Sequence, residues 1–322
     1  MKRTMAVEYS SCDLLHETAE PILGGTYHDA GARVEALLRA GNTNCGGCGM
    51  SIALNMLSHA VKQRPVQMVI PACCGIVTPG RFPNSAYGAP VIAATFASAA
   101  AVATGLAQIA RLNGEKTRAI CFAGDGGTYD IGMATLSAAA ERNEDVLYVC
   151  YDNEIYGNTG GQRSSATPLG AATTTTPFGK DVGKKDILAI MAAHLVPYVA
   201  SISLAHPADT TRKMERALDT EGFRFLHVLA PCPTGWKSEP GLGVELVRSA
   251  VRSGLFPVVE IENGRELTIN VEPDMDPAAL ESYFQGQGRF QRGVDLDVVR
   301  RGIEEHWSEL RRRARTRGAT HA

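Results

Sequence analysis

A regular alternation of strand-like and helix-like segments is the feature that most constrains how this 322-residue chain can fold. Short apolar runs typical of buried strands lie at 66–72, 117–124, 145–152, 198–204, 223–231 and 256–263. Helical patterns lie between them, at roughly 49–63, 91–112, 130–142, 185–194, 207–221 and 242–254. This order predicts an α/β fold in which a parallel sheet carries helices on both faces. Ligands bind such sheets beyond the carboxyl ends of the strands, so the loops after the strands should hold the functional residues.

The composition excludes several functional classes. A formal net charge of −2 gives no electrostatic reason to expect nucleic acid or an anionic membrane as a partner. The eight cysteines are too sparse and unevenly spaced for a disulfide framework, and the first residues contain no apolar core of signal-peptide length. We therefore expect a cytoplasmic protein whose thiols are reduced.

One uncharged run, VIAATFASAAAVATGLAQIA between Pro90 and Arg111, is long enough to cross a bilayer. It consists mostly of Ala, Thr, Ser and Gly, which transfer into hydrocarbon much less favourably than Leu or Ile. The run is therefore predicted to be a buried helix that packs closely against a sheet or a partner, rather than a membrane span.

The loop after the second predicted strand combines three glycines with one aspartate. Its sequence, GDGGTYDIG (124–132), leads directly into a helical pattern. Glycines let the backbone turn tightly, and N–H groups at a helix start form a ready site for a diphosphate. From these residues alone, Asp125 is equally well explained as a helix cap. The G-x-G-x-x-G spacing of a dinucleotide site is absent.

The next predicted strand ends in YDNEIYGNTGGQRSSATP (151–168), which places Asn153 on a loop at the same sheet edge as Asp125. An Asp and an Asn side chain, a backbone carbonyl and two diphosphate oxygens make the all-oxygen set that Mg²⁺ prefers. GDG followed by an Asn-containing strand end resembles the thiamine-diphosphate motif. From GDGG to SSATP the chain is similar to the β subunit of the 2-oxoacid:ferredoxin oxidoreductases, the pyruvate:ferredoxin oxidoreductase family.

The resemblance extends from about Cys45 to QGRF (287–290) and implies the thiamine-diphosphate-binding fold. It implies that Mg²⁺ is held by Asp125, Asn153 and the carbonyl oxygen of Ile155, and that the diphosphate lies on Gly124, Gly126 and Gly127. Asn158 and Thr159, in the GNTGGQ turn, would contact the cofactor. Asn158 would be catalytic, near the thiazolium carbon and its reacting substrate. Without the resemblance, Asn158 reads as a left-handed turn residue.

Two cysteines separated by two glycines, Cys45 and Cys48, precede the first predicted helix in GNTNCGGCGMS (41–51). Read alone, this motif is compatible with a zinc site, a thioredoxin-like disulfide or half of an iron–sulfur site. A four-thiolate cluster needs two further ligands.

The family supplies those ligands from a strand end and from a distant APC segment, and this chain has PACCG (71–75) and APCPTGW (230–236) at the corresponding places. The resemblance therefore implies a [4Fe–4S] cluster held by Cys45, Cys48, Cys74 and Cys232. The family usually has a Gly–Cys pair where this chain has Cys73–Cys74. Counting back from PNSAY (83–87), which is similar to the family's PETAW, favours Cys74, with Cys73 as the alternative. Cys121 and Cys150 lie inside predicted strands and are expected to be buried free thiols.

The resemblance implies one subunit of an enzyme that oxidatively decarboxylates a 2-oxoacid to acyl-CoA and CO₂, with electrons passing through the cluster to ferredoxin or another acceptor. Pyruvate is the favoured substrate, and an aromatic 2-oxoacid such as phenylglyoxylate is the alternative. The chain has no room for a pyrimidine-binding domain. An α subunit is therefore implied to supply that domain and most of the substrate pocket, alongside γ and ferredoxin-like δ subunits.

Two other functional classes would each explain only one of the two groups of motifs. A non-oxidative thiamine-diphosphate decarboxylase would need Asp125 and Asn153 but would have no use for the four cysteines. A zinc-stabilised binding module would use the cysteines but not GDGG together with NTGGQ.

We divide the chain into an N-terminal extension (1–40) that is suited to contact a partner subunit, a cofactor-binding domain (41–292) and a charged helical tail (293–322). The tail ends in several arginines, which complement the helix dipole at a helix C-terminus. A solvated or subunit-contacting helix is therefore preferred over a nucleic-acid site.

Overall fold

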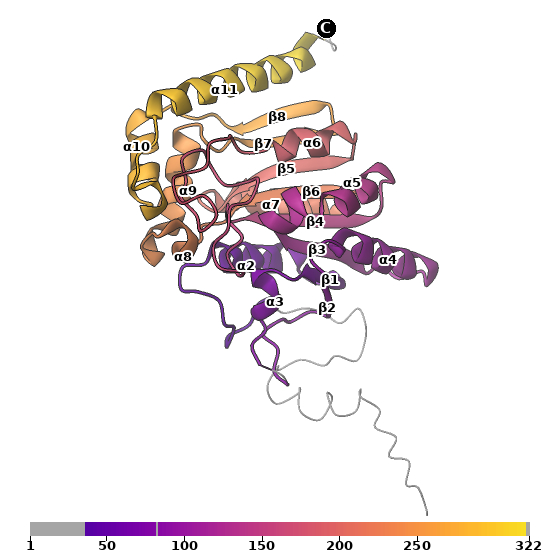
Figure 1. Ribbon diagram of the computed structural model, residues 1–322. Helices are drawn as coiled ribbons and strands as arrows, with labels where there is room; N and C mark the ends of the chain where they lie inside the picture. The colour runs from indigo at the N-terminus through magenta and orange to yellow at the C-terminus, as the bar shows by residue number, and fades with distance from the viewer. Residues whose placement is uncertain (1–35, 82, 320–322) are drawn as a thin grey trace, which may run out of the picture.

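The eight strands of the structure form one sheet with helices on both faces (Figure 1). The structure is a computed structural model, and it describes residues 36–81 and 83–319. The strands are β1 (Val66–Pro71), β2 (Val91–Ala94), β3 (Arg118–Gly124), β4 (Val146–Asp152), β5 (Tyr198–Ser203), β6 (Arg224–Leu229), β7 (Val258–Glu262) and β8 (Glu266–Val271).

The helices in the described part of the chain range from single turns to the long C-terminal helix. They are α2 (Gly49–Val61), α3 (Cys74–Val77), α4 (Ala99–Leu112), α5 (Met133–Glu141), α6 (Ile187–Ala193), α7 (Pro207–Asp219), α8 (Pro233–Trp236), α9 (Gly243–Arg252), α10 (Pro277–Gln285) and α11 (Leu296–Ala319). A short π-helix, η1 (Gly126–Asp130), and two 3₁₀ turns, η2 (Pro240–Leu242) and η3 (Gly288–Phe290), complete the set.

The strand order is β2-β1-β3-β4-β6-β5-β7-β8, and pairing is parallel from β2 through β5. The predicted α/β fold and its six predicted strands are therefore confirmed. The prediction of a wholly parallel sheet was wrong at one edge, where β7 and β8 run antiparallel. Asn263 and Gly264 have positive φ (50° and 67°) in the short β7–β8 turn. A turn this short can join only antiparallel strands, and Asn–Gly is a common hairpin signal.

The predicted helix at 91–112 was wrong over its first residues. Val91 to Ala94 form the edge strand β2, which pairs with β1, and helix α4 begins only at Ala99. The β-branched Val91 and Ile92 find ladder partners on β1, which local sequence cannot reveal. In the rest of the run, Ala103 and Ala107 are buried against the sheet, whereas Leu112 is exposed.

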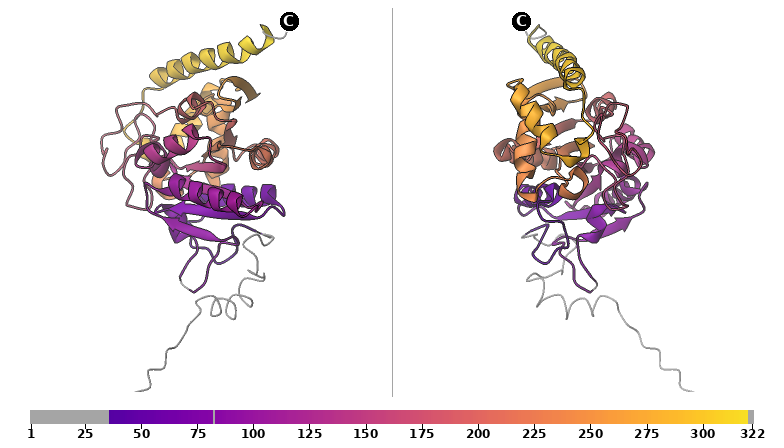
Figure 2. Two further views of the ribbon diagram at one scale, coloured as in Figure 1. Left: turned by 90° about the vertical axis from the view of Figure 1, so that its right-hand side faces the viewer. Right: turned by 60° about the vertical axis from the view of Figure 1, so that its left-hand side comes forward.

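Two hydrophobic cores lie on opposite faces of the sheet. Along β3, Cys121 and Ala123 belong to one core, whereas Ile120 and Phe122 belong to the other, as the two-residue period of a strand requires. Helices α4, α5, α6 and α9 contribute to the first core, and α2 and α7 to the second (Figure 2). Cys121 and Cys150 are buried free thiols, as predicted.

The carboxyl ends of β1, β3, β4 and β6 lie next to one another in the sheet. The register pairs Gly124, the last residue of β3, with Tyr151 of β4. It pairs Asp152, the last residue of β4, with Leu229 of β6. The loops after these strands carry all the predicted ligands except Cys45 and Cys48, which come just before α2. The topology therefore brings the predicted ligands from four separate strand ends to one edge.

The described residues before α2 lie at this edge, where Thr43 and Asn44 line the same cavity as Cys74, whereas the long C-terminal helix packs elsewhere on the sheet. Helix α11 includes most of the charged tail and packs on β8 beside the antiparallel edge (Figure 1). Most of the proposed N-terminal extension, together with Cys12, lies outside the described residues. Within residues 36–81 and 83–319, no helix combines the length and apolarity that a membrane crossing needs.

Candidate functional site

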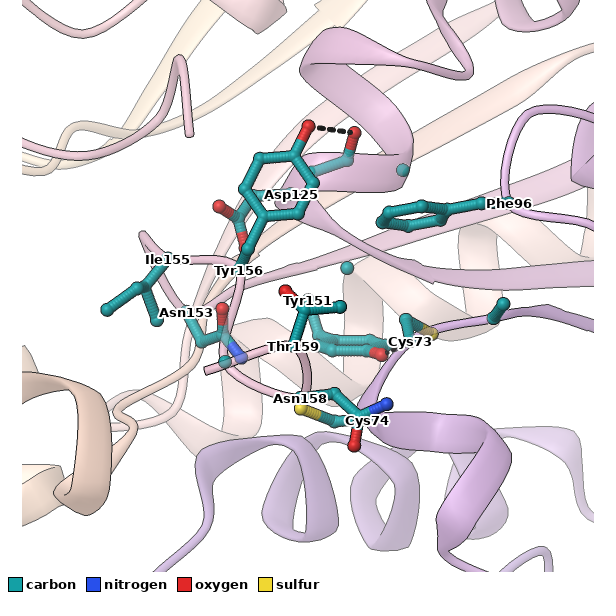
Figure 3. Close-up of a pocket in the computed structure, with 15 residues that line it drawn as sticks. Cys73, Cys74, Phe96, Asp125, Tyr151, Asn153, Ile155, Tyr156, Asn158 and Thr159 are labelled. Atoms are coloured by element: carbon teal, nitrogen blue, oxygen red, sulfur yellow. Dashed lines mark hydrogen bonds between the residues drawn. The ribbon is translucent and has the colours of Figure 1, made fainter. Parts of the chain in front are cut away.

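Three oxygen-bearing groups converge at the ends of β3 and β4. One atom of the Asn153 side-chain amide lies 2.7 Å from Asp125 Oδ1 and 2.7 Å from the carbonyl oxygen of Ile155. With the amide nitrogen at that position, it donates to both oxygens. With the amide oxygen there, three oxygens face one another at nearly the spacing of about 2.9 Å between adjacent ligands of octahedral Mg²⁺. The same geometry thus fits either a hydrogen-bonded Asn153 amide or a bound cation, and Figure 3 shows the side chains of Asp125 and Asn153.

Asp125 is held in an environment that is unfavourable for an uncompensated carboxylate. Its side chain is 1% exposed, and burial raises its pKa well above the ordinary value, with a further increase from the charge of Asp152. The hydroxyl of Ser164 donates a short hydrogen bond to Asp125 Oδ2, which acts in the opposite direction. A cation at this place would stabilise the charged form.

Two buried carboxylates flank Asn153 in the sequence and anchor its loop. Lys184 Nζ lies 2.5 Å from Asp152 Oδ2 and 3.1 Å from Glu154 Oε1, so one ammonium group bridges both. His227 Nε2 and the Tyr129 hydroxyl also contact Asp152 Oδ2, at 2.7 and 2.9 Å. Burial raises the pKa of the Asp152 carboxyl, but Lys184 and His227 outweigh it and hold the pKa far below the ordinary value.

Glu154 has a left-handed backbone conformation, with φ of 62°. Its carboxylate is bound by Lys184, Arg289 and the hydroxyl of Tyr283. These contacts compensate for a conformation that a non-glycine residue seldom adopts. The ion network therefore fixes the turn that presents the Asn153 amide and the Ile155 carbonyl to Asp125.

The glycine loop (124–127), where the diphosphate is expected, has no side chains of its own at Gly124, Gly126 and Gly127. A side chain at Gly126 would collide with the ring of Tyr156, and one at Gly127 would press on Phe96. These two rings meet edge to face with centroids 5.7 Å apart, and Tyr156 Oη donates to Asp130 at 3.1 Å. They cover the loop so closely that the cavity beside it measures only ≈ 20 Å³ (Figure 3).

Asn158 and Thr159 lie on the exposed turn below this loop. Asn158 lines both the small cavity and a larger neighbouring one, and Figure 3 shows its side chain beside Cys74. The Thr159 hydroxyl donates to Gln162 Oε1 at 2.5 Å. In this turn the positive φ angles belong to Gly160 and Gly161, not to Asn158, so the interpretation of Asn158 as a left-handed turn residue is wrong.

Four cysteine side chains line the larger cavity, whose volume is ≈ 690 Å³. They are Cys45, Cys48, Cys74 and Cys232, and the same cavity is lined by Asn153, Ile155 and Asn158. The structure thus brings together the residues that the sequence places up to 187 positions apart, between Cys45 and Cys232. All seven cysteines in the described part of the chain are free thiols.

Glycines allow the Cys45–Cys48 loop to approach the Cys232 segment. Gly47 has φ of 74°, and a side chain there would collide with the backbone of Pro240. A side chain at Gly49 would collide with Pro231, whose carbonyl accepts a hydrogen bond from Gly49 N–H at 2.8 Å. The sequence shows Gly46 and Gly47 between the two cysteines. It did not reveal the close approach at Gly49.

Burial and the proximity of other thiols raise the pKa of two of the four cysteines, Cys74 and Cys232. Burial, followed by the charges of Cys232, Cys73 and Cys48, raises the pKa of Cys74 to about 12. Burial also raises the pKa of Cys232 to about 11, although Gly235 N–H donates to its sulfur at 3.3 Å. Among the described residues, no three His, Cys, Asp or Glu side chains are grouped closely enough to hold a single metal ion. The thiols instead surround a space.

Cys73 and Cys74 both line the small cavity beside the glycine loop, but only Cys74 also lines the larger thiol cavity. Cys74 lines the cavity of the other three thiols, whereas Cys73 is 8% exposed, does not line that cavity and accepts a hydrogen bond from Tyr151 Oη at 2.7 Å. Figure 3 shows the two side chains on opposite sides of their turn.

Sequence reasoning missed the residues that support the ligands. They are Phe96, Tyr129, Asp152, Glu154, Ser164, Lys184, His227 and Arg289. The only available signal was the D-N-E order at the end of β4, where charged residues alternate with Asn153 in an otherwise apolar strand. Lys184 and His227 stand in segments with no such signal.

A family model described as the C-terminal thiamine-pyrophosphate-binding domain of thiamine pyrophosphate enzymes matches residues 66–228. This range runs from β1 into β6. It includes Asp125, Asn153 and Cys74 but not Cys45, Cys48 or Cys232.

Relatives of similar length match most of the chain. The ketoisovalerate oxidoreductase subunit VorB of Pyrococcus abyssi is 39% identical over 292 residues, which cover 87% of this chain and 94% of the relative. The pyruvate synthase subunit PorB of Methanothermobacter marburgensis is 40% identical over 263 residues, which cover 80% of this chain and 90% of the relative.

The fold is also similar to a solved structure, 2-oxoglutarate:ferredoxin oxidoreductase from Magnetococcus marinus with 2-oxoglutarate, coenzyme A and succinyl-CoA bound. The TM-score is 0.56 at 23% identity, over 81% of this chain and 93% of that chain. At this identity the likeness supports the fold alone.

Proposed function

Because the chain belongs to the thiamine-diphosphate-dependent β subunits of the 2-oxoacid:ferredoxin oxidoreductases, we propose that it binds thiamine diphosphate with Mg²⁺ beside a [4Fe–4S] cluster. In that role it oxidatively decarboxylates a 2-oxoacid to acyl-CoA and CO₂ as part of a complex, and passes the electrons to ferredoxin or another acceptor. One observation carries this proposal: the four thiols Cys45, Cys48, Cys74 and Cys232 line the same cavity as Asn153 and Ile155.

The residues present fit Mg²⁺ and a diphosphate. Asp125, Asn153 and the Ile155 carbonyl offer three oxygens to a hard cation, and a cation there would relieve the buried charge of Asp125. Gly124, Gly126 and Gly127 have no side chains of their own to keep a diphosphate from their backbone amides, although aromatic rings of other segments lie against them. Because the free space is small, a diphosphate on this loop requires Phe96 and Tyr156 to move aside.

The thiols fit a cluster better than a single ion. Four cysteines are the ligand set of a [4Fe–4S] centre, and they surround a space rather than a point. Donors already face the sulfurs, with Gly235 N–H at 3.3 Å from Cys232 Sγ and the Thr234 hydroxyl at 3.8 Å from Cys45 Sγ. Since the thiols must lose protons to bind iron, cluster assembly should release protons.

The bound groups would supply an electron sink for the decarboxylation and a low-potential one-electron acceptor. The residues of this chain bind and orient these groups and the substrate. Asp125, Asn153 and Ile155 hold the cation, and the Lys184 network holds their loop. Asn158 borders both cavities and is placed to orient a substrate between the two groups. The chain itself then needs no nucleophile.

The substrate is proposed to be pyruvate, in line with the PorB relative. The VorB relative makes a branched-chain 2-oxoacid the second candidate, because its identity to this chain is nearly the same. The described residues contain no pyrimidine-binding domain, so we propose that an α subunit supplies it together with most of the substrate pocket. Small γ and ferredoxin-like δ subunits, or their fused equivalents, would complete the complex.

Anaerobic purification of the chain with its co-expressed partner subunits tests this proposal. We expect a brown protein with broad absorbance near the blue end, iron and sulfide for one [4Fe–4S] cluster per chain in addition to those of a ferredoxin-like δ subunit, and bound thiamine diphosphate. Viologen dye reduction should then be assayed with pyruvate, a branched-chain 2-oxoacid and phenylglyoxylate, each with and without coenzyme A.

Each alternative gives a distinct result in the same experiment. A colourless protein with stoichiometric zinc would support a zinc-stabilised module. Thiamine-dependent CO₂ release without dye reduction would support a non-oxidative decarboxylase. Full turnover by the chain alone would show that no α subunit is required.

A further inference from the structure

Cys73 is a thiol that the proposed function leaves without a role, although it is adjacent to Cys74 in the chain. It is buried in the core on one face of the sheet, together with Tyr151. The hydroxyl of Tyr151 donates to Cys73 Sγ at 2.7 Å. Tyr151 comes from β4, which is separated from β1 by β3, so this contact spans three neighbouring strands.

The Tyr151 ring reaches Cys73 because Gly124 has no side chain. These two residues are level in the β3–β4 pair, and a Cβ atom at Gly124 would lie 3.2 Å from Tyr151 Cε2. The Tyr151 ring therefore packs against the backbone of Gly124, the last residue of β3, where the glycine loop begins. A side chain there would push the ring away from Cys73.

The same tyrosine holds the turn that carries Cys74. Gly75 N–H donates to Tyr151 Oη at 3.2 Å, and the hydroxyl of Tyr87 donates to the carbonyl oxygen of Gly75 at 2.6 Å. Two tyrosine hydroxyls thus grip the residue that follows Cys74. The Tyr151 hydroxyl contacts both Cys73 Sγ and Gly75 N–H, and its ring lies against Gly124, so this one side chain links the Cys74 turn to the glycine loop.

We propose that Cys73 and Tyr151 are a positioning pair that fixes the Cys74 turn relative to the glycine loop, and that Cys73 is not an iron ligand. This inference rests on the proposed function, since the glycine loop and Cys74 are the proposed diphosphate and cluster sites. Hydrogen-bonded neighbours of ligands orient them and tune the bound group. Cys73 and Tyr151 therefore set how firmly Cys74 is presented to the cluster.

Four variants in the co-purified complex test the pair. Cys73→Ala removes the sulfur, Tyr151→Phe removes only the hydroxyl, and Cys73→Ser keeps an acceptor for that hydroxyl. Cys121→Ala is a matched control, because Cys121 is also a buried thiol next to a β4 tyrosine, its register partner Tyr148, but lies in the core on the opposite face of the sheet. Iron and sulfide content, the rate of iron loss to a chelator and the electron paramagnetic resonance of the reduced cluster are measured for each.

We expect Cys73→Ala and Tyr151→Phe to contain the full iron complement, to lose it about tenfold faster to the chelator and to show a shifted resonance spectrum. Cys73→Ser should restore most of the wild-type rate, and Cys121→Ala should match the wild type.

Faster loss of iron in Cys121→Ala, or no change in Tyr151→Phe, would overturn the inference. So would loss of the cluster in Cys73→Ala, which would make Cys73 a ligand. A wild-type complex without iron would overturn the proposed function and this inference with it, whereas a normal Cys73→Ala variant of an iron-replete complex overturns the inference alone.

Discussion

The two halves of the proposed site share a cavity but are held in different ways. The oxygen half (Asp125, Asn153 and the Ile155 carbonyl) is buried at two adjacent strand ends, and a network of paired charges lies behind it. The thiol half (Cys45, Cys48, Cys74 and Cys232) is more exposed and comes from three loops, whose closest mutual approach is permitted by glycines.

This difference separates two ways of building a ligand set. The oxygen half is preorganised, because the sheet register and the Lys184 network set its geometry before any ligand binds. The thiol half depends on packing between loops, and the raised pKa values of Cys74 and Cys232 oppose their ionisation until iron is bound. The oxygen half should therefore tolerate loss of its ligand better than the thiol half does.

The largest expected effect comes from Asp125→Asn in the oxygen half. We expect thiamine diphosphate with Mg²⁺ to bind more than about a hundredfold more weakly, because a neutral amide replaces the one charged ligand. The free chain should become more stable by about 1 kcal/mol, because a buried carboxylate next to Asp152 is removed. Calorimetric titration and chemical unfolding measure the two effects. Asp181→Asn, on an exposed loop, is the control, and equal affinity of the two variants would contradict the assignment.

A second substitution tests whether the halves are independent. Cys232→Ser should abolish stable iron binding, because an alkoxide is a poor replacement for a thiolate in a four-cysteine cluster. If the halves are independent, affinity for thiamine diphosphate should stay within about twofold of the wild type, since Cys232 Sγ accepts its hydrogen bond from Gly235 and not from the oxygen half. Iron analysis and titration of the same preparation report both quantities. A parallel loss of thiamine affinity, absent in Cys121→Ser, would show that the halves are coupled.

The preorganisation of the oxygen half is tested by Lys184→Met. Removing the ammonium leaves Asp152 and Glu154 buried with less compensation, which should cost about 3 kcal/mol in the free energy of unfolding. Mg²⁺ affinity should fall by about tenfold, because the loop that carries Asn153 loses its anchor. The neighbouring Lys185→Met, whose side chain is more exposed, should cost less than about 1 kcal/mol. If the two variants were equally stable, the network would be incidental.

A network remote from both halves gives the smallest effect and should leave both unchanged. Glu260 on β7 is bound by Arg212, Tyr198 and Asn270. Burial raises the pKa of its carboxyl, but these hydrogen bonds outweigh it and lower the pKa to about 2. Stability from this lowered pKa is present above the ordinary value near 4.5 and is lost as the pH falls toward 2.

Denaturant unfolding as a function of pH measures this contribution. The wild type should lose about 2 kcal/mol between pH 5 and 2 from Glu260, less than the full shift would give because Arg212 is half exposed and screened. Glu260→Gln should flatten this acid limb while leaving iron content and thiamine affinity unchanged. An acid limb as steep as that of the wild type would contradict the assignment.

The sequence by itself determined six of the eight strands, all except β2 and β8, together with the α/β class and the family. Each of these six strands appears as an apolar run with a local period, and the GDG and NTGGQ motifs stand at strand ends in the chain itself, so no distant contact is needed to find them. The Asn–Gly turn between β7 and β8 was equally visible and predicts their antiparallel pairing, although a rule of strict alternation overlooked it.

Tertiary structure alone decided how the candidate ligands are supported and which way they face. Val91 to Ala94 became a strand only because β1 offered a free edge. Adjacent cysteines at 73 and 74 are indistinguishable by composition, and they separate because the turn directs one toward Tyr151 and the other toward the thiol cavity. Lys184 reaches two carboxylates some 30 positions away through folding of a loop without any periodic signal. Such contacts form between residues that are far apart in the chain, so a local sequence pattern does not predict them.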